Sequence, residues 1–213
     1  MKKWIAFCLI MTMLLGLLSG CGNTPAAPAE TSAPTETTAP APTPIGTLYV
    51  SFGATLELTY DENGNALTLI GTNEAGRHLA EAKQDQLNKN CVYTLRSILR
   101  MAISDDLFGD AKTVTVRIGA DDPLPTEDFL QIIGQDCQYL VDEELAGVDM
   151  YCLTGDMLDE KGDITFETAQ LLATVYLGAE ATAAETANTD VYTFTAADKT
   201  CTVDPFSGLV TGK

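Results

Sequence analysis

The side chains that could do chemistry are few, and the single histidine, His78, comes first. A Ser-His-Asp or Cys-His site would have to use it, yet the chain has no Gly-x-Ser-x-Gly nucleophile elbow. A His-Glu-x-x-His metalloprotease helix needs two histidines, and neither a phosphate-binding loop nor a dinucleotide fingerprint is present. Because His78 follows a turn, we expect a surface residue. The sequence therefore predicts no catalytic residue, and we expect the protein not to be an enzyme.

Two acidic segments, Asp61–Asn65 and Gly155–Asp163, could suggest calcium. An EF-hand loop places oxygen ligands at alternate positions, with glycine sixth and glutamate twelfth, and neither segment has that order. The first is better interpreted as a hairpin turn and the second as a solvated loop. We predict no metal site and no cofactor.

Four cysteines remain after Cys8 is removed with a signal peptide and Cys21 is modified: Cys91, Cys137, Cys152 and Cys201. They form no Cys-x-x-Cys pair, which disfavours zinc or thioredoxin-like chemistry. Export would permit disulfides, and buried free thiols are the alternative. The favoured pairing is Cys91–Cys137, between two helices, with Cys152–Cys201, between two strands.

The N-terminus has the layout of an exported protein. Lys2 and Lys3 precede an uncharged apolar run, Trp4–Leu18, that is shorter than the ~20 residues of a membrane span. The run Leu18-Ser19-Gly20-Cys21 resembles the bacterial lipobox. That resemblance implies a signal peptide at 1–20 and a diacylglyceryl group on Cys21.

Residues 21–46 form a Pro/Thr/Ala tether that contains six of the nine prolines. Such a composition cannot bury enough apolar surface to offset its ordering entropy, so we predict a disordered, extended segment. The remaining residues divide into a predicted domain at 47–153 and a smaller module at 154–213.

The chain is strongly acidic, with a formal net charge of −18. Loss of Lys2 and Lys3 with the signal peptide makes the mature chain still more negative. Nucleic acids and anionic lipid surfaces attract proteins of the opposite sign, so we predict that neither is a partner.

Apolar periodicity predicts the elements that must position these residues. Strands with alternating or β-branched residues are expected at Thr47–Ser51, Thr55–Tyr60, Ala66–Thr72, Thr113–Ile118, Val148–Leu153, Val191–Ala196 and Thr200–Val203. Helical stripes are expected between Leu87 and Ala102, between Phe129 and Leu145, and after Thr165 as far as Gly178. The order is βββ-α-β-α-β followed by α-β-β. It favours an α+β fold in which helices cover one face of a mainly antiparallel sheet.

The first domain resembles the extracellular middle domain of RsgI-type anti-sigma factors. The resemblance lies in Leu48–Leu58, Asp61–Asn65 and Gly71–Gly76. The family's Asn-Pro self-cleavage pair is replaced here by Gly53 and Ala54, so the resemblance does not imply self-cleavage. The family's sigma-binding segment and transmembrane helix also lack counterparts, and a lipid anchor stands in their place.

The tail resembles a PepSY module, a small non-catalytic extracytoplasmic unit. The resemblance lies in Ile164–Ala169 at the start of a helix, in Tyr192–Thr195 and in Cys201–Val210. It implies a peptidase-restraining or ligand-binding role.

Together these features predict a non-enzymatic lipoprotein on the extracytoplasmic side of the cell membrane. We expect it to act as a sensor, binding or scaffold domain, and a peptidase-restraining PepSY-type module is the alternative. The expected partners are the membrane, through Cys21, and an envelope protein or exported peptidase. The sequence does not identify the ligand.

Overall fold

The computed structural model describes residues 41–184 and 191–212. The predicted signal peptide, the lipidation site Cys21 and the tether as far as residue 40 lie outside the described residues. The chain divides into two units, Met1–Ala39 and Pro40–Lys213, and the second contains all the helices and strands that the structure describes.

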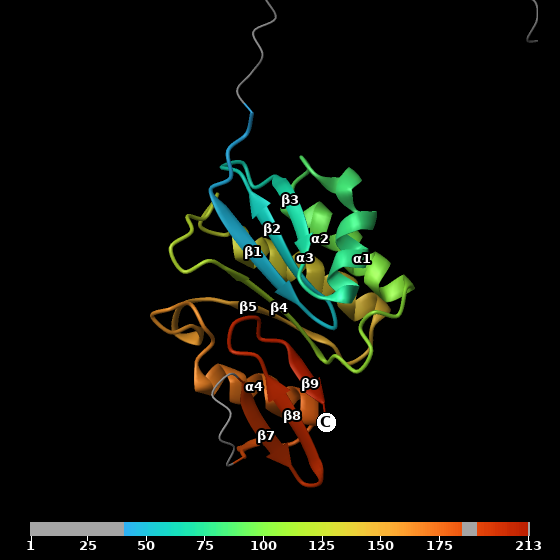
Figure 1. Ribbon diagram of the computed structural model, residues 1–213, viewed down its shortest axis with the longest axis vertical. Helices are drawn as coiled ribbons and strands as arrows, with labels where there is room; N and C mark the ends of the chain where they lie inside the picture. The colour runs from blue at the N-terminus through green and yellow to red at the C-terminus, as the bar shows by residue number, and fades with distance from the viewer. Residues whose placement is uncertain (1–40, 185–190, 213) are drawn as a thin grey trace, which may run out of the picture. The chain divides into compact units, whose positions relative to one another are not determined.

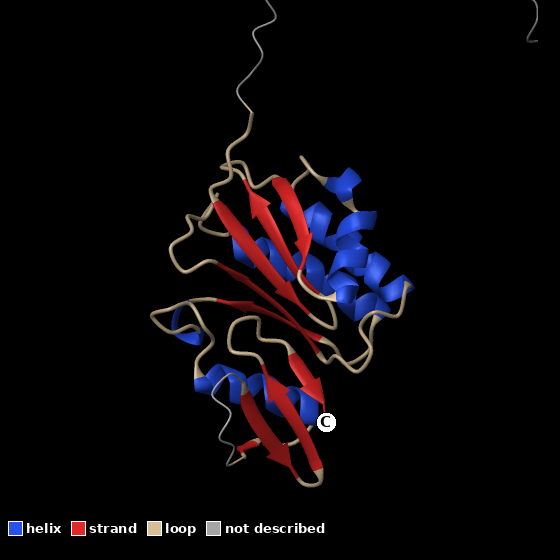
Figure 2. Cartoon of the chain, in the orientation of Figure 1, coloured by secondary structure: helices blue, strands red, loops and turns tan. Residues whose placement is uncertain are grey.

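A five-stranded sheet with the order β3-β2-β1-β4-β5 forms the larger part of the fold (Figure 2). Its strands are β1 (Gly46–Ser51), β2 (Thr55–Tyr60), β3 (Ala66–Gly71), β4 (Thr113–Ile118) and β5 (Asp149–Leu153). All neighbours pair antiparallel except β4 and β5, which are parallel because α3 provides the crossover between them. Hydrogen bonds from Asn63 and Asn65 to the Asp61 carboxylate hold the predicted turn between β2 and β3.

Three helices lie together on one side of this sheet (Figure 1). They are α1 (Glu74–Ala82), α2 (Cys91–Ser104) and α3 (Phe129–Glu144), and a short 3-10 turn, η1 (Gln84–Gln86), precedes α2. Sequence periodicity predicted α2 and α3 but missed α1. Helix α1 is polar, and it begins where the Asn73 side chain accepts a hydrogen bond from the Gly76 N–H at 2.8 Å.

The second sheet has the order β6-β7-β8-β9 and packs on one helix. Its strands are β6 (Thr182–Ala183), β7 (Tyr192–Ala196), β8 (Lys199–Val203) and β9 (Val210–Gly212), and the helix is α4 (Phe166–Leu177). As predicted, Thr165 caps α4 by accepting a hydrogen bond from the Thr168 N–H, and Gly178 ends it in the left-handed conformation. The 3-10 turn η2 (Gly155–Met157) lies between β5 and α4.

Two separate hydrophobic clusters fill the fold. One lies between the first sheet and α1–α3 and runs from Leu48 to Val148, and the other, from Leu153 to Val210, surrounds α4. Strand β5 contributes to both, since Met150 and Cys152 pack against the first cluster while Tyr151 and Leu153 belong to the second. Alternate side chains of one strand therefore serve two cores.

The α+β class is confirmed, and the element order agrees with the prediction apart from α1 and the short strands β6 and β9. Within the part of the chain that the structure describes, no helix combines the length and the apolar character that a membrane span requires.

Candidate binding site

The turn that precedes β9 lies against the face of β4 that is turned away from α1–α3. Thr115 on β4 donates a hydrogen bond from Oγ1 to the backbone oxygen of Ser207, at 2.8 Å. Gly208 adopts a φ of +70°, and a Cβ atom there would lie 3.1 Å from the Thr115 side chain. Glycine thus provides both the backbone conformation and the clearance that this approach needs.

Arg117, two residues further along β4, is buried at the same junction, with 3% of its surface exposed. Its guanidinium carbon lies 4.6 Å from the Tyr49 ring centroid and 4.0 Å from that of Phe206, so the cation packs against both rings, which meet edge to face with 5.1 Å between centroids. Its Nη1 donates to the backbone oxygen of Gly162. This residue therefore links β1 and β4, the acidic loop before α4 and the turn before β9.

Burial lowers the pKa of Arg117. The electrostatic influence of Tyr49, Asp163 and Asp204 opposes that shift. Its Nε and Nη2 atoms have no hydrogen-bond partner among the described residues. Cation–π contact and packing, more than paired charge, therefore stabilise the guanidinium.

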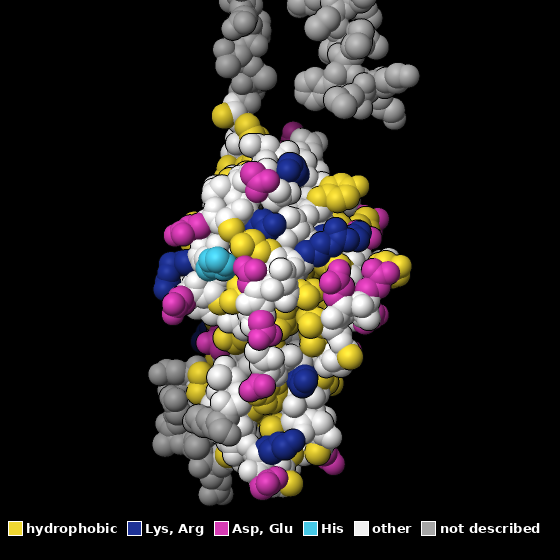
Figure 3. All heavy atoms as spheres, turned by 90° about the vertical axis from the view of Figure 1, so that its right-hand side faces the viewer, with side chains coloured by type: hydrophobic (Ala, Val, Ile, Leu, Met, Phe, Trp, Pro, Cys, Tyr) yellow, Lys and Arg dark blue, Asp and Glu magenta, His cyan; other side chains and the backbone are white. Residues whose placement is uncertain are grey.

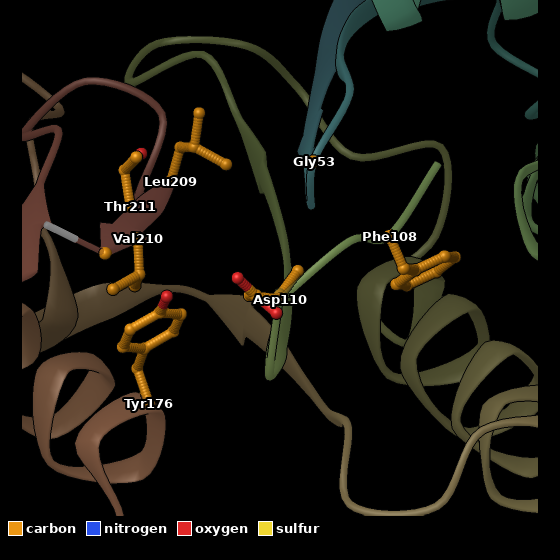
Figure 4. Close-up of a pocket in the computed structure, with 9 residues that line it drawn as sticks. Gly53, Phe108, Asp110, Tyr176, Leu209, Val210 and Thr211 are labelled. Atoms are coloured by element: carbon orange, nitrogen blue, oxygen red, sulfur yellow. The ribbon is translucent and has the colours of Figure 1, made fainter. Parts of the chain in front are cut away.

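Beside this junction lies a groove of about 480 Å³ (Figure 4). Its walls come from four parts of the chain: Gly53 between β1 and β2; Phe108, Asp110 and Ala111 before β4; Tyr176 on α4; and Leu209, Val210, Thr211 and Gly212 in and before β9. In Figure 4 the Tyr176 side chain extends from α4 toward Val210, while Asp110 comes from the segment before β4. Burial and the Asp110 charge raise the pKa of Tyr176, and a backbone hydrogen bond at Gly212 opposes the shift.

Strand β9 is an edge strand whose outer side borders this groove. The Asp204 N–H donates to the Leu209 carbonyl, and Val203 pairs with Val210 in the next register position. Because hydrogen-bonded and non-hydrogen-bonded pairs alternate in an antiparallel ladder, the Val210 N–H and C=O point away from β8. Such an edge can accept a further strand.

The edges of the first sheet are covered by the chain itself. At β3, Ala66 exchanges backbone hydrogen bonds with Lys89 and Asn88. At β5, the Met150 N–H donates to the Gln138 side-chain oxygen at 2.7 Å. Ala66 of β3 and Met150 of β5 thus already have hydrogen-bond partners within the chain at these two edges.

Asp110, which is exposed, gives the groove a negative charge, and its lining contains no Lys, Arg or His. On the face shown in Figure 3, acidic, basic and apolar side chains are interspersed over α1 and its surroundings. The cyan side chain in that view is His78, the only histidine. It is exposed, as expected, and its Nε2 lies 2.9 Å from Asp105 Oδ2.

The second acidic segment has a structural role that the sequence did not indicate. Asp159 accepts backbone hydrogen bonds from Lys161 and Asp163, and this turn presents the Gly162 carbonyl to Arg117. Among the residues at 41–184 and 191–212, no group of three or more His, Cys, Asp or Glu side chains is arranged to hold a metal ion.

The four cysteines are free thiols in the structure, and neither bridge of the favoured pairing is formed. Cys91 begins α2 beside the turn at Gly64, and Asp61 is the charged neighbour that acts on its thiol. Cys137 lies on α3, with Cys152 as its neighbour. Cys201 belongs to the other core, so the pair Cys152–Cys201 would join side chains that face different cores.

No protein-family model matches the chain, and no curated protein matches it either. Ala54 is fully buried, and its carbonyl accepts a hydrogen bond from the Phe52 N–H. Sequence reasoning identified none of the groove residues. The junction beside the groove did carry a signal: Arg117, a charge in the otherwise alternating Thr-Val strand of β4.

Proposed function

We propose that this chain is a non-enzymatic lipoprotein of the cell envelope whose globular part binds an extended segment of a partner protein. In this proposal a lipid on Cys21 holds it on the extracytoplasmic side of the membrane, and residues 21–46 act as the tether. Its role is that of a sensor, binding or scaffold domain. The observation that carries the proposal is the groove bordered by the outer edge of β9.

The lining of the groove suits a peptide backbone. Val210 supplies an outward N–H and C=O for a strand-like ligand. Phe108 stacks on Phe52 with 4.7 Å between centroids, so the apolar wall at that end is held in place by the first core.

Charge selects among extended ligands. The chain carries a formal net charge of −18, and Asp110 is the charged residue of the groove lining. A segment that carries Lys or Arg is therefore attracted both by the field of the whole protein and by one local carboxylate.

A labelled model peptide tests the proposal directly. The probe is an extended peptide of alternating Val/Thr and Lys residues, and its binding is followed by fluorescence anisotropy at low ionic strength. We expect binding that weakens when Lys is replaced by Glu. We also expect it to be lost when alternate backbone nitrogens are methylated, because methylation removes the N–H groups needed for strand addition while retaining the side chains.

Asp110→Asn should weaken the lysine peptide about two- to fivefold, the range for a solvent-exposed ion pair. The matched control is Asp156→Asn, an exposed aspartate in η2 that is outside the groove lining. Equal losses in both variants would indicate general attraction to an acidic surface. Equal affinity of the methylated and unmethylated peptides would contradict binding at β9.

The membrane anchor has its own test. Cys21→Ser should move the exported protein from the detergent phase to the aqueous phase, because two acyl chains provide stable attachment. Aqueous partitioning of the unchanged chain would contradict the lipid anchor.

A second candidate function is restraint of an exported peptidase. It is favoured by the C-terminal module, where α4 and the β7–β8 hairpin enclose a core of their own. In that case, the purified chain should lower the turnover of the peptidase, whereas a scaffold should bind it and leave turnover unchanged.

A further inference from the structure

Two thiols outside the groove lie near each other on the helix-covered side of the first sheet. Cys137, on α3, is fully buried, and Cys152, on β5, is half-buried. Both pack with the first hydrophobic cluster.

Helix α3 lies close to β5 at Gly134. A Cβ atom on Gly134 would lie only 2.9 Å from the Cys152 Sγ, and that Sγ donates to the Leu130 carbonyl at 3.3 Å. Cys137 is three residues beyond Gly134, and residues three apart on a helix have Cβ atoms about 5–6 Å apart. Cys137 therefore lies about one turn further along the face of α3 that contacts Cys152.

The pKa of Cys137 reflects the same proximity. Burial raises it to about 12, and the largest electrostatic contribution comes from Cys152. Cys91 has Asp61 as its charged neighbour, and Cys201 lies in the other core.

Cys152 is also the accessible member of the pair. It lines a shallow hollow of about 530 Å³ between α3 and the β5 edge, together with Gln131, Gln135 and Gln138. A small oxidant can reach this thiol from solvent, whereas Cys137 is fully buried.

We propose that Cys137 and Cys152 form a disulfide that fastens α3 to β5 when the chain meets an oxidised small thiol such as glutathione disulfide. The Cys152 thiolate attacks one sulfur of the small disulfide, which forms a mixed disulfide and releases one thiolate. The Cys137 thiolate then attacks Cys152 Sγ and releases the second. The two cysteines lose two protons and two electrons, and glutathione disulfide is reduced to two thiols.

The reaction should be slow at neutral pH. Burial raises the pKa of Cys152 to about 11. The thiolate fraction therefore grows about tenfold for each pH unit up to that value. An incubation at pH 8.5 with glutathione disulfide then gives a measurable rate.

Peptide mapping of the full chain tests the bond. The chain contains no Lys or Arg between Arg117 and Lys161, so a tryptic peptide would hold both cysteines; cleavage after Glu143 and Glu144 separates them. After acid quenching and alkylation, we expect the link between Cys137 and Cys152 to dominate. It should persist in a Cys91→Ser/Cys201→Ser double variant and disappear in Cys152→Ser.

Thermal unfolding separates loss of the disulfide from misfolding of a variant. Oxidation should raise the Tm of the double variant and leave that of Cys152→Ser unchanged. Two results would overturn the proposal: alkylation of both Cys137 and Cys152 after an incubation that fully oxidises a control dithiol, or a dominant link from either one to Cys91 or Cys201.

Discussion

The two faces of β4 are buried against very different partners. Val114 and Val116 pack into the apolar cluster beneath α1–α3. On the other face, Thr115 contacts the turn before β9, and Arg117 contacts the loop before α4. The first face is buried by non-directional apolar contact, and the second by hydrogen bonds and an aromatic–cation stack. Strand β4 therefore shows how a strand can be covered on both sides when only one of its own sides is apolar.

The two faces of β4 should therefore tolerate different substitutions. Loss of volume on the apolar face leaves a cavity that its neighbours cannot fill. Loss of a polar group on the other face leaves its partner without a hydrogen bond. The following substitutions test this contrast in order of expected effect.

The largest effect is expected on the helix side. Leu140→Ala removes a fully buried side chain of α3 and should lower the free energy of unfolding by about 2–5 kcal/mol. Urea denaturation measures it. The control, Leu171→Ala, removes a leucine that is 42% exposed and should change the free energy by at most about 0.5 kcal/mol.

At the junction, Arg117→Ala should cost about 3 kcal/mol, because it leaves a cavity beside the Tyr49 and Phe206 rings and removes the cation. Arg117→Met should cost less than half as much, since its side chain fills the same cavity without the unpaired Nε and Nη2. If Met proved as damaging as Ala in the same denaturation experiment, hydrogen bonding and charge would outweigh packing there.

Thr115→Val isolates one hydrogen bond of the junction. The change keeps the shape of the side chain but removes the donor to the Ser207 carbonyl. We expect a loss of about 1 kcal/mol, the ordinary net value of such a bond. A variant as stable as the original chain would mean that the turn before β9 is held by Arg117 and packing alone.

The smallest effect should depend on pH and lies at the β2–β3 turn. Burial tends to raise the pKa of Asp61, but hydrogen bonds from Asn65 and Asn63 outweigh it and lower the pKa below its ordinary value of 3.8. A carboxyl whose pKa is lower in the folded state stabilises the fold at pH values above its unfolded-state pKa. This stabilisation is lost as the pH falls through its folded-state pKa. Asp61→Asn should therefore be less stable than the original chain at pH 7, and the gap should close below pH 3.8. A gap that is independent of pH would contradict this cause.

The sequence predicted those strands and helices whose residues show a clear local pattern. Alternation identified β1, β2 and β4, and the Thr165 and Gly178 caps marked the ends of α4. Helix α1 was missed because its residues are mostly polar and its start depends on Asn73. The groove could not be predicted, because Asp110, Tyr176 and Val210 come together only through tertiary packing.

Hydrogen exchange of the β9 amides, with and without the lysine peptide, tests whether an extended peptide binds along the outer edge of β9. Strand addition should slow exchange at Val210, whose N–H points away from β8, and leave the covered edge at Met150 unchanged. Slower exchange along β5 or β3 with none at Val210, or no change at saturating peptide, would contradict a binding site at this groove.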